Sequence, residues 1–186
     1  VISVKSQGVF RKQTSYQLHR GIEVKGALEF TKEPVTTIES KGYQFEIEGL
    51  DFNNDNQTDM LISAVDIGLG KVLGALVTGA VSIDLNFYQM RNGLYAAKPD
   101  LKRDIKATFD LRSGDFFFPS VLIADADGDG FDDLLVQEGE DQLNIFLGSG
   151  DASLFSKSPM VIDVHMPSDP ELVVTADLNR DGKVDL

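Results

Sequence analysis

Three acidic segments of the sequence share one spacing of oxygen-bearing side chains. In the clearest, Asp125, Asp127, Asp129 and Asp133 occupy positions 1, 3, 5 and 9 of a loop that runs into an apolar segment. Ca²⁺ prefers six to eight oxygen ligands, and carboxylates crowded into so short a loop would otherwise repel one another. The spacing therefore predicts a calcium site, to which Phe131 at position 7 adds its backbone carbonyl.

Two further segments repeat this spacing, with an amide in place of the second carboxylate. Because Asn53 and Asn179 bring less charge than Asp127, we expect the second loop to bind Ca²⁺ most tightly. The predicted ligands are Asp51, Asn53, Asp55, Gln57 and Asp59 in the first loop, and Asp177, Asn179, Asp181, Lys183 and Asp185 in the third, with carbonyls from Gln57 and Lys183.

Position 6 of each loop has to turn sharply. Gly130 and Gly182 can take the positive φ that such a turn requires, and Asn56 tolerates the left-handed region better than most residues. We therefore expect all three loops to turn there, and the first site to be the weakest.

The loops differ from an EF-hand at position 12. An EF-hand places a bidentate Glu there, whereas Ile62 and Val136 stand at that position in the first two loops. The same difference argues against a dockerin loop, so the ligand set closes at position 9. A single loop of this kind could be a solvated turn, but three copies favour metal sites. We expect them to be structural sites that carry no activity themselves.

A second element recurs after the loops. The segment Leu143–Asp151 reads LNIFLGSGD, and an earlier one, Leu85–Tyr88, is followed by a turn at Asn92 and Gly93. Loop, strand and turn together resemble the FG-GAP/VCBS repeats of calcium-bearing β-propellers, which include the head of integrin α subunits. The resemblance covers about residues 45–186. It is to the VCBS branch more than to integrin, because no Phe-Gly…Gly-Ala-Pro string is present.

This resemblance implies an all-β fold of about three propeller blades, which would form an incomplete propeller. The loops start 74 and 52 residues apart, at Asp51, Asp125 and Asp177, and repeats of about 50 residues are typical of blades. We expect one propeller-type region over residues 1–186: a degenerate blade at 1–50, a repeat with an insertion at 51–124, a repeat at 125–176 and a truncated repeat from 177.

Most apolar runs have the length of strands and are bounded by Gly, Asp or Asn. The expected strands are Ser15–Leu18, Ile22–Phe30, Val35–Glu39, Gln44–Ile47, Met60–Ala64, Ser82–Tyr88, Val121–Ala124, Leu134–Gln137, Asn144–Leu147, Val161–Val164 and Leu172–Thr175.

The extra length of the first repeat lies in the Gly-rich stretch 66–81. Its periodicity predicts a short helix near residues 67–79 that presents Leu69, Val72, Leu73 and Leu76 to the core. Docking of a partner is the alternative. A nucleotide-binding loop is excluded, because Lys71 is followed by Val72 and not by Ser or Thr.

The net charge of −13 disfavours nucleic acid and anionic membrane surfaces as partners. The chain has no cysteine, so calcium would take the place of disulfides as the stabilising crosslink. Both ends look cut, and we expect an excerpt of a longer exported protein, located extracellularly, in the periplasm or at the cell surface. The remaining blades of the same polypeptide would then be its neighbours.

Catalytic constellations are scarce. His19 and His165 lie in unrelated contexts, and most closely spaced carboxylates belong to the loops. The run Phe116–Phe118 could stack on sugars, although a strand entering the core is the preferred interpretation. Two functions remain: a calcium-stabilised module for protein or glycan recognition and adhesion, or the scaffold of an exported polysaccharide lyase or hydrolase. A fold alone does not decide between them.

Overall fold

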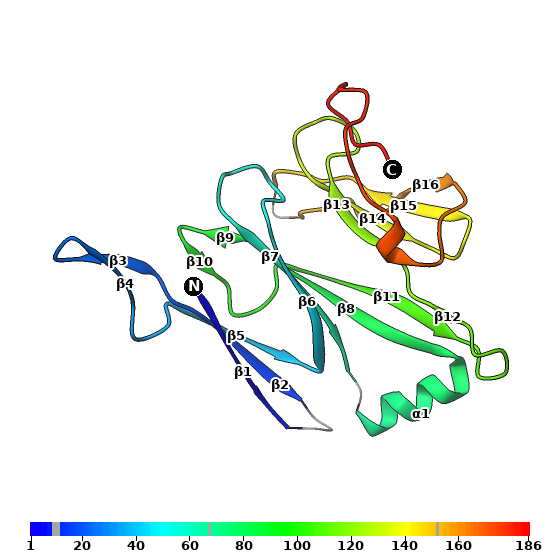
Figure 1. Ribbon diagram of the computed structural model, residues 1–186, viewed down its shortest axis with the longest axis horizontal. Coiled ribbons are helices and arrows are strands. Elements are labelled where there is room, and N and C mark those ends of the chain that lie inside the picture. The colour runs from blue at the N-terminus through cyan, green and yellow to red at the C-terminus, as the bar shows by residue number, and fades with distance from the viewer. Residues whose placement is uncertain (9–11, 67, 152) are drawn as a thin grey trace. The chain divides into compact units, whose positions relative to one another are not determined.

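The computed structural model describes residues 1–8, 12–66, 68–151 and 153–186, without the side chains of residues 45–48 and 69. The chain divides into two compact units. The first comprises residues 1–49, 58–77 and 82–104, and the second comprises 50–57, 78–81 and 105–186. β-Strands dominate the described residues and none of their sheets closes on itself, so the predicted all-β fold is confirmed (Figure 1).

The first unit contains two groups of antiparallel strands and two small hairpins. In one group β1 (Ile2–Gln7), β2 (Gln13–Leu18) and β5 (Thr36–Lys41) pair in that order. In the other, β6 (Tyr43–Leu50), β7 (Asp59–Val65) and β8 (Ala80–Tyr88) are neighbours. The hairpins are β3 (Gly21–Val24) with β4 (Ala27–Phe30), and β9 (Met90–Arg91) with β10 (Leu94–Tyr95).

Apolar side chains from both groups of strands and from β10 form the core of the first unit. These are Tyr16, Ile38, Met60, Ile62, Tyr88 and Tyr95, all nearly inaccessible to solvent. Burial raises the pKa of the Tyr16, Tyr88 and Tyr95 hydroxyls to about 12.

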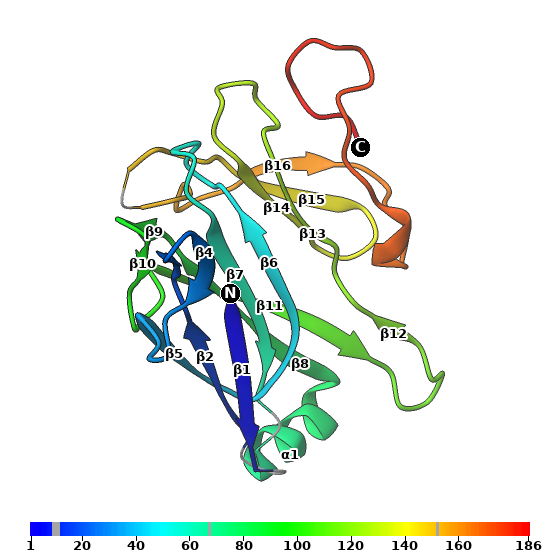
Figure 2. The same cartoon turned by 60° about the vertical axis from the view of Figure 1, so that its left-hand side comes forward.

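The second unit contains a four-stranded antiparallel sheet and a hairpin. The sheet is a meander that runs in sequence order, β13 (Val121–Ala124), β14 (Asp133–Gln137), β15 (Gln142–Phe146) and β16 (Met160–Asp163), which is the strand order expected of a blade (Figure 2). The hairpin joins β11 (Leu101–Phe109) to β12 (Phe116–Phe117). The core cluster of the second unit contains the buried side chains of Leu135, Leu143, Ile145 and Met166.

Two of the expected strands differ in the structure. The Ile22–Phe30 run is the hairpin β3–β4, because Lys25 and Gly26 both take positive φ and reverse the chain. Leu172–Thr175 begins in a 3₁₀ turn, η1 (Pro170–Leu172), and forms no strand. The Asp169 carboxylate caps this turn by accepting the N–H of Glu171, and proline at the first position favours it.

The predicted helix forms as α1 (Leu69–Thr78), but its expected packing is wrong. Val72, Leu73 and Leu76 are 42%, 65% and 52% exposed. The side chain of Leu69 and residue 67 lie outside the described part of the chain. Periodicity places these side chains on one stripe of a helix, yet it cannot say whether another element covers that stripe.

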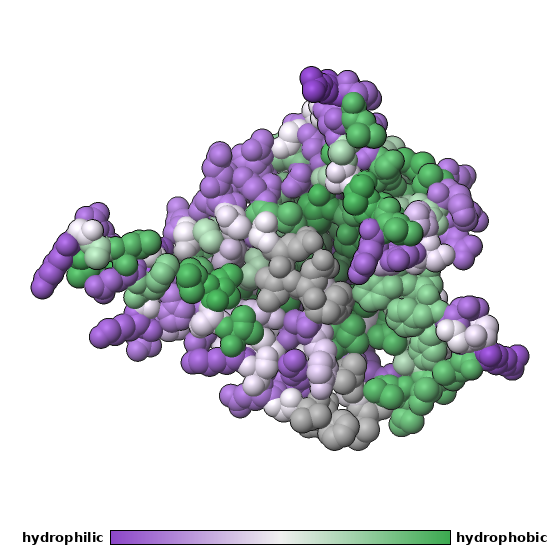
Figure 3. All heavy atoms as spheres, in the orientation of Figure 1, coloured by the Kyte–Doolittle hydropathy of each residue, from purple (hydrophilic) through white to green (hydrophobic). Residues whose placement is uncertain are grey.

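Apolar side chains also lie on the surface of the β3–β4 hairpin. Leu28 is 74% and Phe30 47% exposed, and Figure 3 shows this hairpin with apolar residues at its surface, at the left of the view. The apolar run that predicted a strand at Ile22–Phe30 therefore stays in contact with water.

We predict that Phe155→Ala lowers the free energy of unfolding by about 3–5 kcal/mol, the usual cost of removing a buried ring. Phe155 is 2% exposed, and its ring packs edge-on against Phe52 with centroids 6.0 Å apart. The matched control is Phe116→Ala, which should change stability by less than about 1 kcal/mol because Phe116 is 59% exposed. Chemical denaturation measures both, and equal losses would contradict the packing.

Candidate metal centre

The second loop joins β13 to β14 and is folded by its own carboxylates. Ala124 and Asp133 are paired across the two strands. Between them, Asp125 accepts the backbone N–H of Gly128 at 2.7 Å and of Gly130 at 2.9 Å. Asp129 accepts the N–H of Phe131 at 2.9 Å. The carboxylates at positions 1 and 5 therefore fix the backbone of the loop between positions 4 and 7 by hydrogen bonds.

The other two loops repeat this hydrogen-bond scheme. At position 1, Asp51 accepts the N–H of Asn56 at 2.8 Å and Asp177 accepts that of Gly182 at 3.1 Å. At position 5, Asp55 and Asp181 each accept the N–H found two residues later, at 2.8 and 2.9 Å. The three loops that share one spacing of side chains therefore also share one pattern of hydrogen bonds.

Two positions of each loop are left-handed. Position 6 has φ of 64° at Asn56, 90° at Gly130 and 86° at Gly182, so the predicted turn is present in all three loops. Position 4 is left-handed as well, with φ of 52° at Asn54, 83° at Gly128 and 62° at Arg180. Sequence reasoning missed this second turn, because these three residues share no side-chain type.

In the first two loops the carboxylate at position 9 is buried and accepts hydrogen bonds from backbone N–H groups. Asp133 is 0% exposed and accepts the N–H of Ala126 at 2.9 Å and of Gly148 at 2.6 Å. Asp59 is also 0% exposed and accepts the N–H of Met90 at 2.7 Å.

The same strand register produces these contacts in both repeats. Met60 pairs with Tyr88 across β7 and β8, and Leu134 pairs with Phe146 across β14 and β15. In each case the donor to position 9, Met90 or Gly148, lies two residues beyond the paired strand residue. In the third loop, Asp185 accepts the N–H of Leu178 at 2.9 Å and pairs with Ala176.

The turn after β15 lies directly on the second loop. A Cβ atom at Gly148 would stand 2.2 Å from the carbonyl oxygen of Asp132, and one at Gly150 would stand 2.9 Å from the Phe131 ring. No side chain fits at such distances. The two glycines in the Leu-Gly-Ser-Gly turn are therefore required by this close approach.

The loops contact one another within the second unit. The N–H of Asp132 donates to the carbonyl of Phe52 in the first loop at 3.2 Å. The N–H of Val184 in the third loop donates to the carbonyl of Asp125 at 3.0 Å. The second loop thus bonds to both of the others, although the loops are far apart in sequence.

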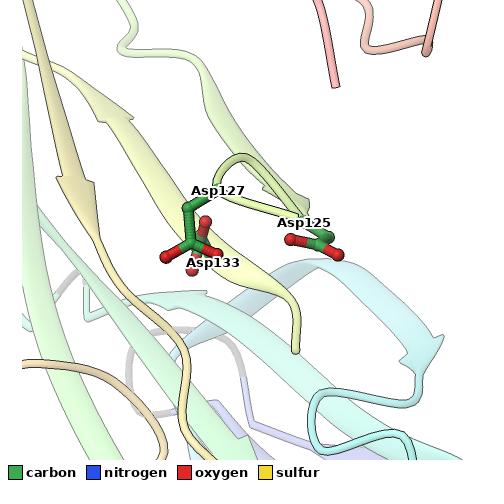
Figure 4. A group of neighbouring side chains, drawn as sticks. All are labelled: Asp125, Asp127 and Asp133. Carbon is green, nitrogen blue, oxygen red and sulfur yellow. The ribbon is translucent and has the colours of Figure 1, made fainter. Parts of the chain in front are cut away.

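Three of the predicted ligands in the second loop converge. Single carboxylate oxygens of Asp125, Asp127 and Asp133 lie within 4.8 Å of one another, and Figure 4 shows the first two on the loop and the third at the start of β14. In the other loops the amide at position 3 lies next to position 5. Asn53 donates to Asp55 at 3.2 Å and Asn179 to Asp181 at 3.1 Å.

Burial raises the pKa of Asp133 above its usual range. The N–H groups of Gly148 and Ala126 partly oppose this shift, and Asp127 and Asp129 add to it. Burial also raises the pKa of Asp132, with further contributions from Asp125 and Asp51. The carboxylates gathered here form a set of hard oxygen donors, and such a set fits Ca²⁺.

The two imidazoles lie in different units and outside the loops. His19 bonds through Nδ1 to the carbonyl of Thr31 at 2.7 Å in the first unit. In the second, His165 and Asp141 form an exposed ion pair at 2.8 Å. The hydrogen bond to Asp141 raises the pKa of His165.

Comparison with protein families identifies the class of domain. Residues 105–186 match the family model described as an FG-GAP-like repeat. The FG-GAP/VCBS resemblance is therefore confirmed over residues 105–186. The match includes the second and third loops and all of the β13–β16 sheet.

Comparisons with curated proteins and with solved structures found no match. Among the described residues, no helix has the length and apolar character needed to span a membrane.

We predict that Gly148→Ala destabilises the protein by about 1–3 kcal/mol, the usual cost of overpacking. The added methyl group would collide with the Asp132 carbonyl and displace the N–H that donates to Asp133. Gly74→Ala is the control: a Cβ there meets no atom within 4 Å, and alanine favours the helix, so stability should not fall. Thermal unfolding measures both, and an unchanged Gly148 variant would contradict the close approach.

Proposed function

We propose that the three loops bind Ca²⁺ and that the bound ions stabilise the repeats. The convergence of Asp125, Asp127 and Asp133 supports this proposal most directly. A divalent cation there would neutralise the buried charge of Asp133, which its two N–H donors only partly stabilise. The ligands are those predicted from sequence, with analogous sets in the first and third loops.

Hydrogen bonds within the chain already fix the conformation that such a calcium site requires. The position 1 carboxylates accept the N–H of position 6, which fixes the turn. In the second loop, Asp133 at the start of β14 accepts the N–H of Ala126 and so connects the loop to this strand. A bound Ca²⁺ would supply positive charge to the carboxylates of Asp125, Asp127 and Asp133, which already converge. Its effect is therefore on stability and not on a reaction.

We further propose that the domain is an exported module for recognition or adhesion, with a protein or glycan as its partner. Two observations support this proposal. Residues 105–186 match an FG-GAP-like repeat, and the loop carboxylates accept hydrogen bonds from the backbone of their own loop. Extracellular calcium concentrations suit sites of moderate affinity. Secretion of the full-length protein by its native host would test the location, and retention in the cytoplasm would contradict it.

We predict that calcium raises the melting temperature of the protein and that Asp129→Ala removes part of this increase. Asp129 is a predicted ligand and also holds the N–H of Phe131. Asp163→Ala is the control, because it removes an exposed carboxylate on β16 outside the loops and should keep the full increase. Melting curves in calcium and in chelator measure the effect. Identical curves for the unaltered protein in both conditions would refute calcium stabilisation.

We also predict that the second loop binds Ca²⁺ most tightly, by about tenfold, because it alone has a carboxylate at position 3. Calorimetric titration should show that Asp129→Ala removes the tightest site, whereas Asp55→Ala and Asp181→Ala each remove a weaker one. The variant Asp127→Asn should reduce the tight site to the level of the others. The opposite order of affinities would contradict this assignment.

A further inference from the structure

A depression of about 370 Å³ lies at the end of the β11–β12 hairpin. Three segments line it: the hairpin with its turn, the turn before β15 at Glu140, and the segment after β16 at Ser168. All of these residues belong to the second unit, and none is a predicted calcium ligand. The volume is that of a site for a small group or a side chain.

One wall of the depression is aromatic. Phe109 and Phe116 are directly opposite each other in the hairpin, so their side chains share one face. The Phe118 ring lies 6.4 Å from that of Phe116. Phe116 stays 59% exposed, which corrects the expectation that this run simply enters the core. An aromatic face is therefore open at the rim of the depression.

The remaining polar lining is acidic. Asp110, Asp115 and Glu140 contribute carboxylates, and none of the described lining residues is basic. Asp110 accepts the N–H of Arg112 at 2.7 Å and its own N–H donates to the Asp115 carbonyl at 2.9 Å, which fixes the turn. Among the described residues, no hydrogen-bond donor to the carboxylates of Asp115 and Glu140 is present.

The charge of the chain is concentrated in the part that contains this depression. Residues 105–186 hold 17 acidic and five basic side chains, a net charge of −12 out of −13 for the whole chain. Two cationic groups lie close to the lining residues in sequence: Arg112, in the turn between Asp110 and Asp115, and His165, which is paired with Asp141 and has its pKa raised further by Glu140. Such a field attracts cationic partners and speeds their association.

We propose that this depression binds an arginine side chain from a basic segment of a partner protein. A guanidinium group stacks on an aromatic ring and donates a planar fork of hydrogen bonds to carboxylates, which are the two features of this lining. A neutral sugar would use the Phe116 face but would not need three carboxylates. The inference extends the proposed recognition role to a partner class and does not depend on calcium, because the loops do not line the depression.

The test is a titration of the full chain, in saturating calcium and in chelator, with blocked five-residue peptides that differ at one central residue. Arginine, lysine and citrulline versions are compared by NMR chemical shifts and calorimetry. We expect the arginine peptide to bind more tightly than the lysine peptide, and citrulline, which has the same shape without charge, to bind at least tenfold more weakly. Binding in chelator that matches binding in calcium would separate this site from the loops.

Matched variants then locate the binding. Phe116→Ala and Asp115→Asn should each weaken arginine binding about three- to fivefold. Phe30→Ala and Glu29→Gln make the same changes at exposed positions of the β3–β4 hairpin and should leave it unchanged. If the depression variants and the hairpin variants lose equal affinity for the arginine peptide, the peptide is attracted unspecifically to the acidic chain, and the proposed site is wrong. Absence of arginine binding, or equal binding of citrulline or a neutral oligosaccharide, would overturn the proposal.

Discussion

The buried carboxylate at position 9 is the constraint on which the first two repeats depend. Asp59 and Asp133 are fully buried at the first residue of β7 and β14. Burial of a charge is costly unless hydrogen bonds or an opposite charge compensate it. Asp133 obtains its bonds from two places, the start of its loop and the turn after the next strand. One side chain therefore fixes loop, strand pair and turn relative to one another.

Contacts between loops make the second unit more than a series of separate turns. The backbone of the second loop bonds to Phe52 of the first and to Val184 of the third. The Phe52 ring also packs against Phe155, which follows the glycine turn of the second repeat. Repeats of this kind are stabilised by their neighbours, so the first loop belongs with the second unit although 47 residues separate Gln57 from Ile105 in sequence.

The acidic character of residues 105–186 has two different structural roles. The loop carboxylates accept backbone N–H groups of their own loop, and three of them converge at the proposed calcium site. Asp115 and Glu140 instead face an open depression beside the Phe116 ring. The loop carboxylates thus set the shape of the repeat, whereas Asp115 and Glu140 line the depression that we propose for a partner. The proposed calcium role and the proposed recognition role therefore use separate residues.

The sequence by itself determined the features that depend on short-range spacing. Carboxylates at positions 1 and 5 meet N–H groups only two to five residues away, and the alternation of apolar runs and turns places most strands, so loops and strands were predictable. Only the tertiary structure decided which segments distant in sequence contact one another. The hydrogen bonds from Gly148 and Met90 to the buried aspartates join segments that are distant in sequence. The same is true of the close approach that excludes side chains from the glycine turn. The exposure of Leu73 and Phe116 also depends on distant segments, because it is decided by whether any of them covers these side chains. Periodicity defines a face of a helix or strand, but burial depends on whether another part of the chain covers that face.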